Sequence, residues 1–166
     1  ANFLTDESLN RIDHRCIQET QMQFIPYLNF NGNCAEAMAF YAKVFGGKQG
    51  PVMTFGSMPP MPEMPPIPDS AKNAVMHTFV QVGDQEIMAS DVMPEACGGA
   101  KYQPPQGMQL SVRVDTVEEG ERIFQALSDG GTITMPFAKT FWSPGFGMVT
   151  DRFGTPWMVN VFEQPA

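Results

Sequence analysis

Cysteine, histidine and basic residues are scarce in this chain of 166 residues. The three cysteines, Cys16, Cys34 and Cys97, show no CxxC spacing, which argues against a structural zinc site and a disulfide framework. Only 2 histidines occur, and 10 Lys and Arg residues against 18 Asp and Glu leave a net charge of −8. We therefore expect neither a nucleic-acid partner nor an anionic-membrane surface.

Long hydrophobic runs are also missing. No stretch approaches the roughly 20 apolar residues of a membrane span, and no charged segment leads into the apolar run of a signal peptide. Because reduced thiols are the default for so few cysteines, we expect a cytoplasmic protein. Hydrophobic residues still make up 43% of the chain, which is enough for one domain or for two small halves that share a core.

Capping residues predict two helices of similar length. The first, over residues 34–45, begins at a capping box of Asn33 and Glu36, and the second, over residues 117–128, follows a similar box at Thr116. A Gly-Gly pair ends each helix. Apolar and alternating residues predict strands over 23–30, 48–56, 73–82 and 85–91 around the first helix, and over 107–114, 132–139, 146–149 and 156–162 around the second. Each half therefore has a β-α-β-β-β order.

The helices overlay with the offset that separates Phe40 from Phe124, which indicates an internal repeat. Between the first two groups of strands, residues 57–72 are rich in Pro and Met and form either a surface insertion or a flap over a cavity. The predicted segments are an N-terminal extension, disordered or loosely docked (1–21), a first βαβββ module (22–91), a linker (92–106) and a second βαβββ module (107–162), with 22–166 as one structural domain.

Two modules of this kind predict an α+β fold. Each module would be a curled mixed sheet with its helix on the convex face. Side by side, the modules would form an incompletely closed barrel with the helices outside and a concave groove within.

Two motifs resemble the signatures of a known family. The run F-W-x-x-G-F-G-x-V-T-D-x-F-G-x-P-W-M-x-N spans Phe141 to Asn160, and P-Y-x-x-F-x-G-N-C-x-x-A-x-x-F-Y begins at Pro26. Both are similar to PhnB-like proteins of the glyoxalase/bleomycin resistance/dioxygenase (vicinal oxygen chelate) superfamily, some of which are labelled 3-demethylubiquinone-9 3-methyltransferase-like. The resemblance implies the same fold, an active site in the groove and a homodimer. The superfamily hosts isomerases, dioxygenases, thiol transferases and metal-free drug-binding proteins.

The resemblance also implies where a metal would be bound. In metal-using members the ligands, commonly His, Gln or Glu, come from the first and last strand of each repeat. Here the last strands supply Met88 and Met158, and the first strands supply Pro26, within a residue, and about Gln109. Thioethers and proline cannot build a site for a hard cation, so we expect no metal.

A different metal site remains open at the hairpin whose turn is centred on Gly83 and Asp84. With that turn, His77 and Asp91 would lie opposite each other, as weak candidates for catalysis or for a two-ligand site with Mn, Ni, Zn or Fe. A structural hydrogen bond between them is equally open. Strand alternation is read as pointing Glu86 away from the groove.

The groove would then owe its character to aromatic and Met side chains with a few polar groups, as is usual for small-molecule sites. One hypothesis is a protein that binds a small apolar or aromatic molecule without metal. The alternative is a divalent-metal enzyme of isomerase, lyase or dioxygenase type. A third reading is that Trp142 and Trp157 pack against each other and fill the groove. No glycine-rich loop for S-adenosylmethionine is present. The candidate groove residues are Tyr27, Phe55, His77, Met88, Ser90, Gln109, Phe141, Trp142, Trp157, Met158 and Asn160.

Overall fold

The strands form two separate sheets in the computed structural model, which describes residues 22–60, 62, 66–93, 95 and 98–162. The predicted N-terminal extension lies outside these residues. The first sheet has the order β1-β5-β4-β2, with β3 also pairing with β4, and the second has the order β6-β9-β8-β7. The first module consists of β1 (Tyr27–Phe30), α1 (Cys34–Phe45), β2 (Lys48–Gln49), β3 (Met53–Thr54), the 3-10 helices η1 (Phe55–Ser57) and η2 (Asp69–Ala71), β4 (Val75–Val82) and β5 (Gln85–Asp91).

The second sheet repeats this plan with one helix between its first and second strands. Its elements are β6 (Leu110–Val114), α2 (Val117–Ser128), β7 (Thr132–Ala138), β8 (Phe146–Thr150) and β9 (Pro156–Val161). In both sheets the first strand runs parallel to the last, and the other pairs run antiparallel. The repeated βαβββ order and the α+β class predicted from the sequence are therefore confirmed. The described strands do not close into a barrel.

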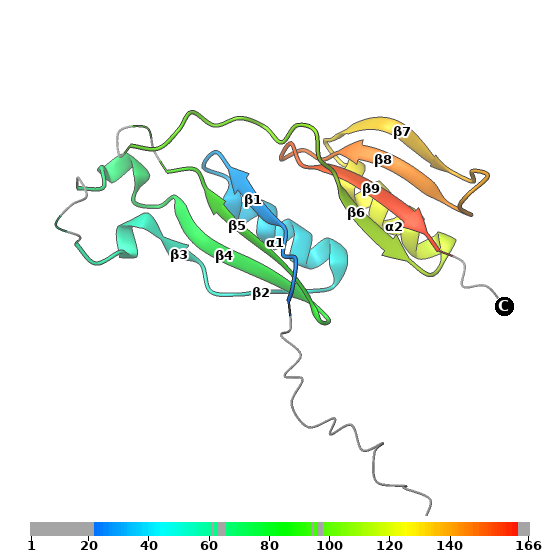
Figure 1. Cartoon of the computed structure of the whole chain (residues 1–166), viewed down its shortest axis with the longest axis horizontal. Helices are drawn as coiled ribbons and strands as arrows, with labels where there is room; N and C mark the ends of the chain where they lie inside the picture. The colour runs from blue at the N-terminus through cyan, green and yellow to red at the C-terminus, as the bar shows by residue number, and fades with distance from the viewer. Residues whose placement is uncertain (1–21, 61, 63–65, 94, 96–97, 163–166) are drawn as a thin grey trace, which may run out of the picture.

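Each helix covers one face of its own sheet and leaves the other face open. In Figure 1 both helices lie behind the sheets, so the two open faces look toward the same side. Burial alternates along β9 accordingly: Trp157, Val159 and Val161 are buried under the helices, whereas Met158 and Asn160 are half-buried on the open face. The bounds of both helices match the predictions.

The two helices begin in different ways. Thr116 caps α2, because its side-chain oxygen accepts a hydrogen bond from the Glu119 amide at 3.2 Å. At α1 the predicted capping box is wrong: the Asn33 side chain makes no capping bond. Its place is taken by Asp91, at the end of β5, whose Oδ1 accepts hydrogen bonds from the amides of Gly32 and Cys34 at 2.7 and 3.1 Å.

Three strands are shorter than predicted, and prolines account for two of them. The strand expected from residue 23 begins at Tyr27, after Pro26, and the strand expected over residues 48–56 is broken at Pro51 into β2 and β3. The strand expected from residue 107 begins at Leu110. Proline has no amide hydrogen to donate to a neighbouring strand, so it ends or interrupts pairing.

A buried carboxylate joins the two modules. Asp151, in the turn between β8 and β9, accepts hydrogen bonds from the Tyr41 hydroxyl at 2.6 Å and from Trp157 Nε1 at 2.8 Å. The amides of Phe153 and Thr155 donate to its other oxygen. Since Tyr41 belongs to α1 and the other donors belong to the second module, this cluster connects them through the core.

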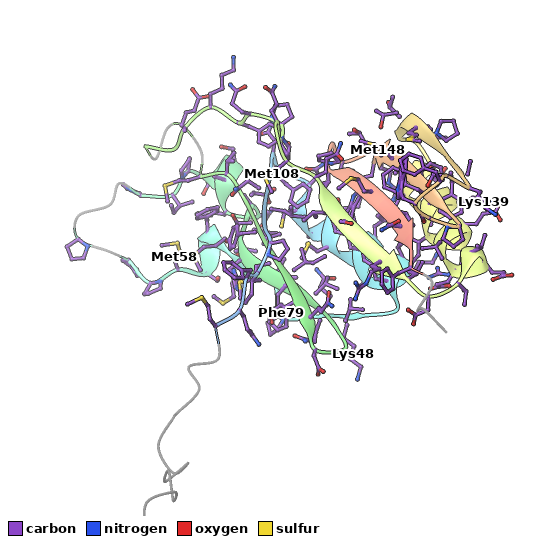
Figure 2. All side chains as sticks on the ribbon, turned by 45° about the vertical axis from the view of Figure 1, so that its right-hand side comes forward. Lys48, Met58, Phe79, Met108, Lys139 and Met148 are labelled. Carbon is purple, nitrogen blue, oxygen red and sulfur yellow. The ribbon has the colours of Figure 1, made fainter. Side chains whose placement is uncertain are left out.

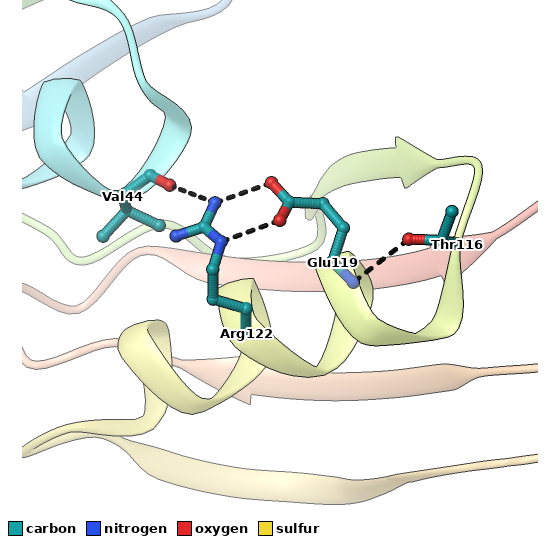
Figure 3. Close-up of polar contacts among 4 residues, drawn as sticks. All are labelled: Val44, Thr116, Glu119 and Arg122. Carbon is teal, nitrogen blue, oxygen red and sulfur yellow. Dashed lines mark hydrogen bonds and ion pairs between the residues drawn. The ribbon is translucent and has the colours of Figure 1, made fainter.

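A second link crosses between the modules at the surface. Figure 3 shows Arg122 of α2 between two acceptors. Its guanidinium donates to the Val44 carbonyl at the end of α1 at 2.9 Å, and it is paired with the Glu119 carboxylate at 2.7 Å. The Glu119 carboxylate therefore pairs with Arg122. It does not accept the hydrogen bond from the Thr116 amide that would complete the predicted capping box.

Candidate functional site

The open face of the first sheet carries aromatic side chains, among them the pair Tyr27 and His77. Tyr27 on β1 lies beside Met88 on β5, which in turn lies beside Phe79 on β4. The rings of Tyr27 and His77 stack with their centroids 6.1 Å apart. Gly50 makes room for the Phe79 ring, since a Cβ on that glycine would lie 2.3 Å from it. This half of the candidate site is therefore a shallow aromatic surface.

Polar groups lie next to this aromatic surface. Asn29 pairs with Ser90, and the Ser90 hydroxyl donates a hydrogen bond to Asn29 Oδ1 at 3.3 Å. By register His77 lies opposite Ser90, because Thr78 pairs with Ala89. Asn29, Ser90 and His77 could thus orient a ligand that rests on the rings of Tyr27 and Phe79.

The open face of the second sheet is rich in sulfur. Met135, Met148 and Met158 pair directly across β7, β8 and β9, and Ser111 on β6 lies beside Met158. Figure 2 shows Met148 on this sheet and Phe79 on the other. In the next row, Asn160 pairs with Phe146, and the buried Asn160 Oδ1 has no hydrogen-bond partner among the described protein groups.

An exposed aromatic cluster lies in the connection between β7 and β8, next to the second sheet. Phe141 is 95% exposed and Trp142 is 53% exposed. Their ring centroids are 4.5 Å apart, and Trp142 also contacts Phe146 edge-on at 5.6 Å. Clusters of large, exposed apolar side chains are typical of surfaces that contact a ligand or another protein.

The structure places two of the predicted groove residues elsewhere. Trp157 is 1% exposed and packs against Tyr41 and Phe45 with centroids 5.2 Å away from each. Phe55 is buried in η1. Because the two tryptophans lie on opposite faces of the second sheet, the reading in which Trp142 and Trp157 pack against each other is also wrong. The residues that remain on or beside the open faces are Tyr27, His77, Met88, Ser90, Gln109, Phe141, Trp142, Met158 and Asn160.

The predicted pairing of His77 with Asp91 is wrong by one residue of register. Thr78 pairs with Ala89, so His77 lies opposite Ser90 and Asp91 falls on the helix side. A shift of one residue moves a side chain to the other face of a sheet. Asp91 is 3% exposed, and its Oδ2 accepts a hydrogen bond from the Val75 amide at 2.8 Å. It is thus a structural residue that ties β4, β5 and α1 together.

The prediction that Glu86 points away from the groove is also wrong. Glu86 is two residues from Met88 on the same strand, so both side chains lie on the same face. Sequence reasoning also passed over Phe79, Ser111 and Met148 on the open faces. Side chains alternate between the two faces of a strand. The correct register of each strand pair would therefore have placed these three residues on the open faces.

Two ionisable groups of α1 are held in the neutral form. Burial and the nearby Asp91 carboxylate raise the pKa of the Cys34 thiol to about 12. Burial, reinforced by the charge of Asp151, also raises the pKa of Tyr41. Since a reactive cysteine needs a lowered pKa and access to solvent, Cys34 is a packing residue and no nucleophile.

A cleft of about 860 Å³ lies where the edges of the two sheets meet. One wall is formed by residues 23–26 and the β4–β5 hairpin, and the other by β6. Phe45, Ile123 and Trp157 contribute apolar surface, and Glu86 and Arg113 contribute charge. The cleft therefore separates the two open faces.

The residues on the paired first and last strands, where the resemblance implies that a metal would be bound, do not fit a hard divalent ion. The resemblance points to Pro26, within a residue, and to about Gln109 on the first strands, and by register Tyr27 lies beside Met88 and Ser111 beside Met158. Two thioethers, a phenol and a hydroxyl supply neither carboxylate nor imidazole, the ligands that Mn²⁺ and related ions take in such sites. Among the described residues, no cluster of three His, Cys, Asp or Glu could hold a metal ion either.

Comparison with known proteins identifies the family. The family model described as 3-demethylubiquinone-9 3-methyltransferase matches residues 22–160. Over 153 residues the chain is 40% identical to protein YjdN of Escherichia coli (strain K12), an alignment that covers 86% of this chain and 97% of that protein. The chain belongs to the PhnB-like family of the glyoxalase/bleomycin resistance/dioxygenase superfamily.

Solved structures agree with this family. Protein PA1353 from Pseudomonas aeruginosa is 40% identical with a TM-score of 0.76, over 86% of this chain and 99% of that one. A PhnB protein from Bacillus cereus is 25% identical with a TM-score of 0.65, over 85% and 100%. The fosfomycin resistance protein FosX from Listeria monocytogenes, in a complex with Mn(II), is 9% identical with a TM-score of 0.56 over 84% and 91%, and it shares the fold.

Proposed function

We propose that this protein binds a small apolar or aromatic molecule on the open faces of its sheets, without a divalent metal. The observation that carries the proposal is the side-chain set on the paired first and last strands of each sheet, Tyr27 with Met88 and Ser111 with Met158. Aromatic and thioether groups make dispersion contacts with flat apolar molecules. Asn29, Ser90 and Asn160 supply the few polar groups that orient such a ligand.

A second copy of the chain would complete the site. Within one chain the open faces look to the same side and are separated by the cleft at the sheet edges. A ligand on either face would remain largely exposed, whereas binding sites bury most of a small ligand. A homodimer that covers the open faces would enclose it, and the exposed Phe141 and Trp142 would lie in the contact.

Fluorescence of N-phenyl-1-naphthylamine, an uncharged aromatic probe, tests the binding site. We expect saturable binding that Tyr27→Ala and Met158→Ala each weaken by about tenfold. Val117→Ala, which removes an exposed apolar side chain from α2, is the matched control and should leave binding unchanged. Equal affinity in all four proteins would overturn the proposal.

Light scattering during size-exclusion chromatography tests the dimer. We expect the mass of two chains, and a shift toward one chain for Phe141→Ser, because a dimer contact would bury an aromatic ring that is 95% exposed in the single chain. A chain that is monomeric with the probe bound would show that one copy suffices.

One observation favours a second candidate, a divalent-metal enzyme of isomerase, lyase or dioxygenase type. His77 is an imidazole on the open face, next to Ser90 and Asn29. Metal analysis after growth with Mn, Ni, Zn and Fe separates the candidates. Near-stoichiometric metal that is lost in His77→Ala would replace the binding-protein proposal with the enzyme, whereas metal that survives this change would be bound elsewhere.

The helix N-termini give no support to the methyltransferase description of the family. Binding S-adenosylmethionine through a helix N-terminus would need free amides there. At α1 the Asp91 carboxylate already accepts from Gly32 and Cys34, and at α2 Thr116 accepts from Glu119. The expected cytoplasmic location stays a prediction from cysteine usage. No helix in the described part of the chain is long and apolar enough to cross a bilayer.

A further inference from the structure

Three methionines form a straight row across the open face of the second sheet. Met135 pairs with Met148 across β7 and β8, and Met148 pairs with Met158 across β8 and β9. All three are half-buried and none lies in the core. We refer to these three residues as the methionine ladder. The register places three methionine residues on adjacent strands of one face, although Met135 and Met158 are far apart in the sequence.

An irregularity of β7 produces this alignment. The register of β7 against β8 shifts between Ile133 and Met135 and again between Met135 and Ala138. Without the first shift, the strand would place residue 134 opposite Met148. A bulge re-aims the side chain that follows it, and here it brings Met135 onto the face that Met148 and Met158 share.

The donor atoms of the ladder are soft and carry no charge. The neighbouring residue in the row is Ser111, so four adjacent strands present three thioethers and one hydroxyl and no formal charge. Hard divalent cations need oxygen ligands, most often carboxylates. Thioethers are soft ligands, and they select soft monovalent ions such as Cu(I). A neutral donor set favours a single positive charge over two.

The spacing of the ladder suits a three-coordinate ion. Side chains directly opposite on neighbouring strands have Cβ atoms about 5 Å apart, and methionine has three rotatable bonds. The outer two side chains, Met135 and Met158, can therefore turn toward Met148 without movement of the backbone. We propose that the methionine ladder is a binding site for a soft monovalent cation of the Cu(I) or Ag(I) type.

Silver(I) nitrate in chloride-free buffer is the probe. The chain carries the changes Cys16→Ser and Cys97→Ser, so that these thiols do not compete, and its methionines are labelled with ¹³C at the methyl group. Cys34 is retained because it is fully buried. One equivalent of Ag(I) should shift the methyl signals of Met135, Met148 and Met158 and leave the others of the 13 methionines in place.

Leucine variants test the ladder by affinity. Met148→Leu keeps the volume and removes the sulfur, a swap that folded proteins tolerate well. We expect it to weaken Ag(I) binding by at least about tenfold. Met22→Leu is the matched control, because Met22 is 77% exposed and precedes the first strand. If Met148→Leu folds poorly, Met135→Leu at the edge strand serves the same purpose.

Several results would overturn the proposal. Equal Ag(I) affinity of Met148→Leu and the original chain is one such result, and shifted methyl signals from methionines outside the ladder are another. Mn(II) or Zn(II) shifting the ladder methyls as Ag(I) does would show that the site has no preference for soft ions. The outcome is independent of the proposed ligand binding, since probe binding is measured without Ag(I) and Ag(I) binding without the probe.

Discussion

The two modules place equivalent strand pairs side by side, β1 with β5 and β6 with β9, yet they offer different surfaces. On the first module Tyr27 stacks on His77 and Phe79 rests above Gly50. On the second, the corresponding rows hold the methionine ladder. The two open faces thus differ in chemistry, although the pairing of the first strand with the last is the same in both sheets.

The modules also differ in how they use a buried aspartate, and this difference carries the largest expected effect. Asp151→Ala removes the acceptor of the Tyr41 hydroxyl, Trp157 Nε1 and two amides in one step. Because the partners are left unpaired in the core, we expect unfolding to become easier by about 3–5 kcal/mol. Urea denaturation followed by far-UV circular dichroism measures it.

A surface aspartate provides the comparison for that experiment. Asp129 is in an ion pair with Arg152 at 3.7 Å, and its side chain is 80% exposed. Asp129→Ala should therefore cost less than about 1 kcal/mol. Equal losses for the two variants would show that Asp151 does not join the modules.

The next effect separates the two helix starts. Asp91→Ala removes the acceptor of three amides, those of Gly32, Cys34 and Val75, and we expect a loss of about 2–3 kcal/mol. Thr116→Ala removes one capping bond and should cost about 1 kcal/mol. The same urea experiment checks both. A larger loss for Thr116→Ala than for Asp91→Ala would contradict the view that the remote Asp91 carboxylate stabilises its module more than the local cap does.

Alkaline pH should act mainly through the first module. The folded-state pKa of Cys34 is about 12 against an ordinary 9.0, and that of Tyr41 is raised above 10.0. Their contribution is complete below the ordinary pKa and is lost as the pH rises above it, since the unfolded chain then releases protons that the folded chain retains. We expect the unfolding free energy to fall above about pH 9, by up to about 1.4 kcal/mol per pH unit and group.

Variants that cannot titrate isolate this effect. Cys34→Ala and Tyr41→Phe each lower stability at pH 7, and each should flatten the decline between pH 9 and pH 11. Urea midpoints measured at pH 7, 9, 10 and 11 give the slope for each protein. An unchanged slope in both variants would assign the alkaline loss to other groups.

The smallest expected effect concerns the surface link between the modules. Arg122→Gln removes the hydrogen bond to the Val44 carbonyl and the pair with Glu119, at a cost of about 1 kcal/mol because the side chain is half-exposed. Glu118→Gln, an exposed change in the first turn of the same helix, is the control and should cost a few tenths. A thermal melt of the two variants distinguishes them, and identical melting temperatures would show that Arg122 contributes nothing to docking.

Local signals in the sequence were sufficient for the helices and turns. Gly46 ends α1 in a left-handed conformation with φ of 65°, and Gly154 takes φ of 88° in the β8–β9 turn. Such glycines act on their immediate neighbours, so a sequence window contains the whole cause. Both helices and the repeated element order were predicted for this reason.

The site was harder to predict because it depends on register and on distant partners. Placing His77 opposite Asp91 was an error of one residue in a hairpin, and it reversed which face Asp91 occupies. Nothing near Asn33 in the sequence indicates that a carboxylate 58 residues later starts the helix, as the difference between residues 33 and 91 shows. Trp157 was misplaced because a tryptophan suits a core as well as a groove.

The remote cap of α1 also has a consequence for synthesis on the ribosome. Thr116 is made just before α2, so that helix has its first hydrogen-bond acceptor as soon as it leaves the exit tunnel. The amides of Gly32 and Cys34 must wait until Asp91 emerges. Contacts between residues far apart in the chain form late, because the intervening loop has to close first. A nascent chain halted before residue 91 would thus carry an α1 with no anchor for its first turn.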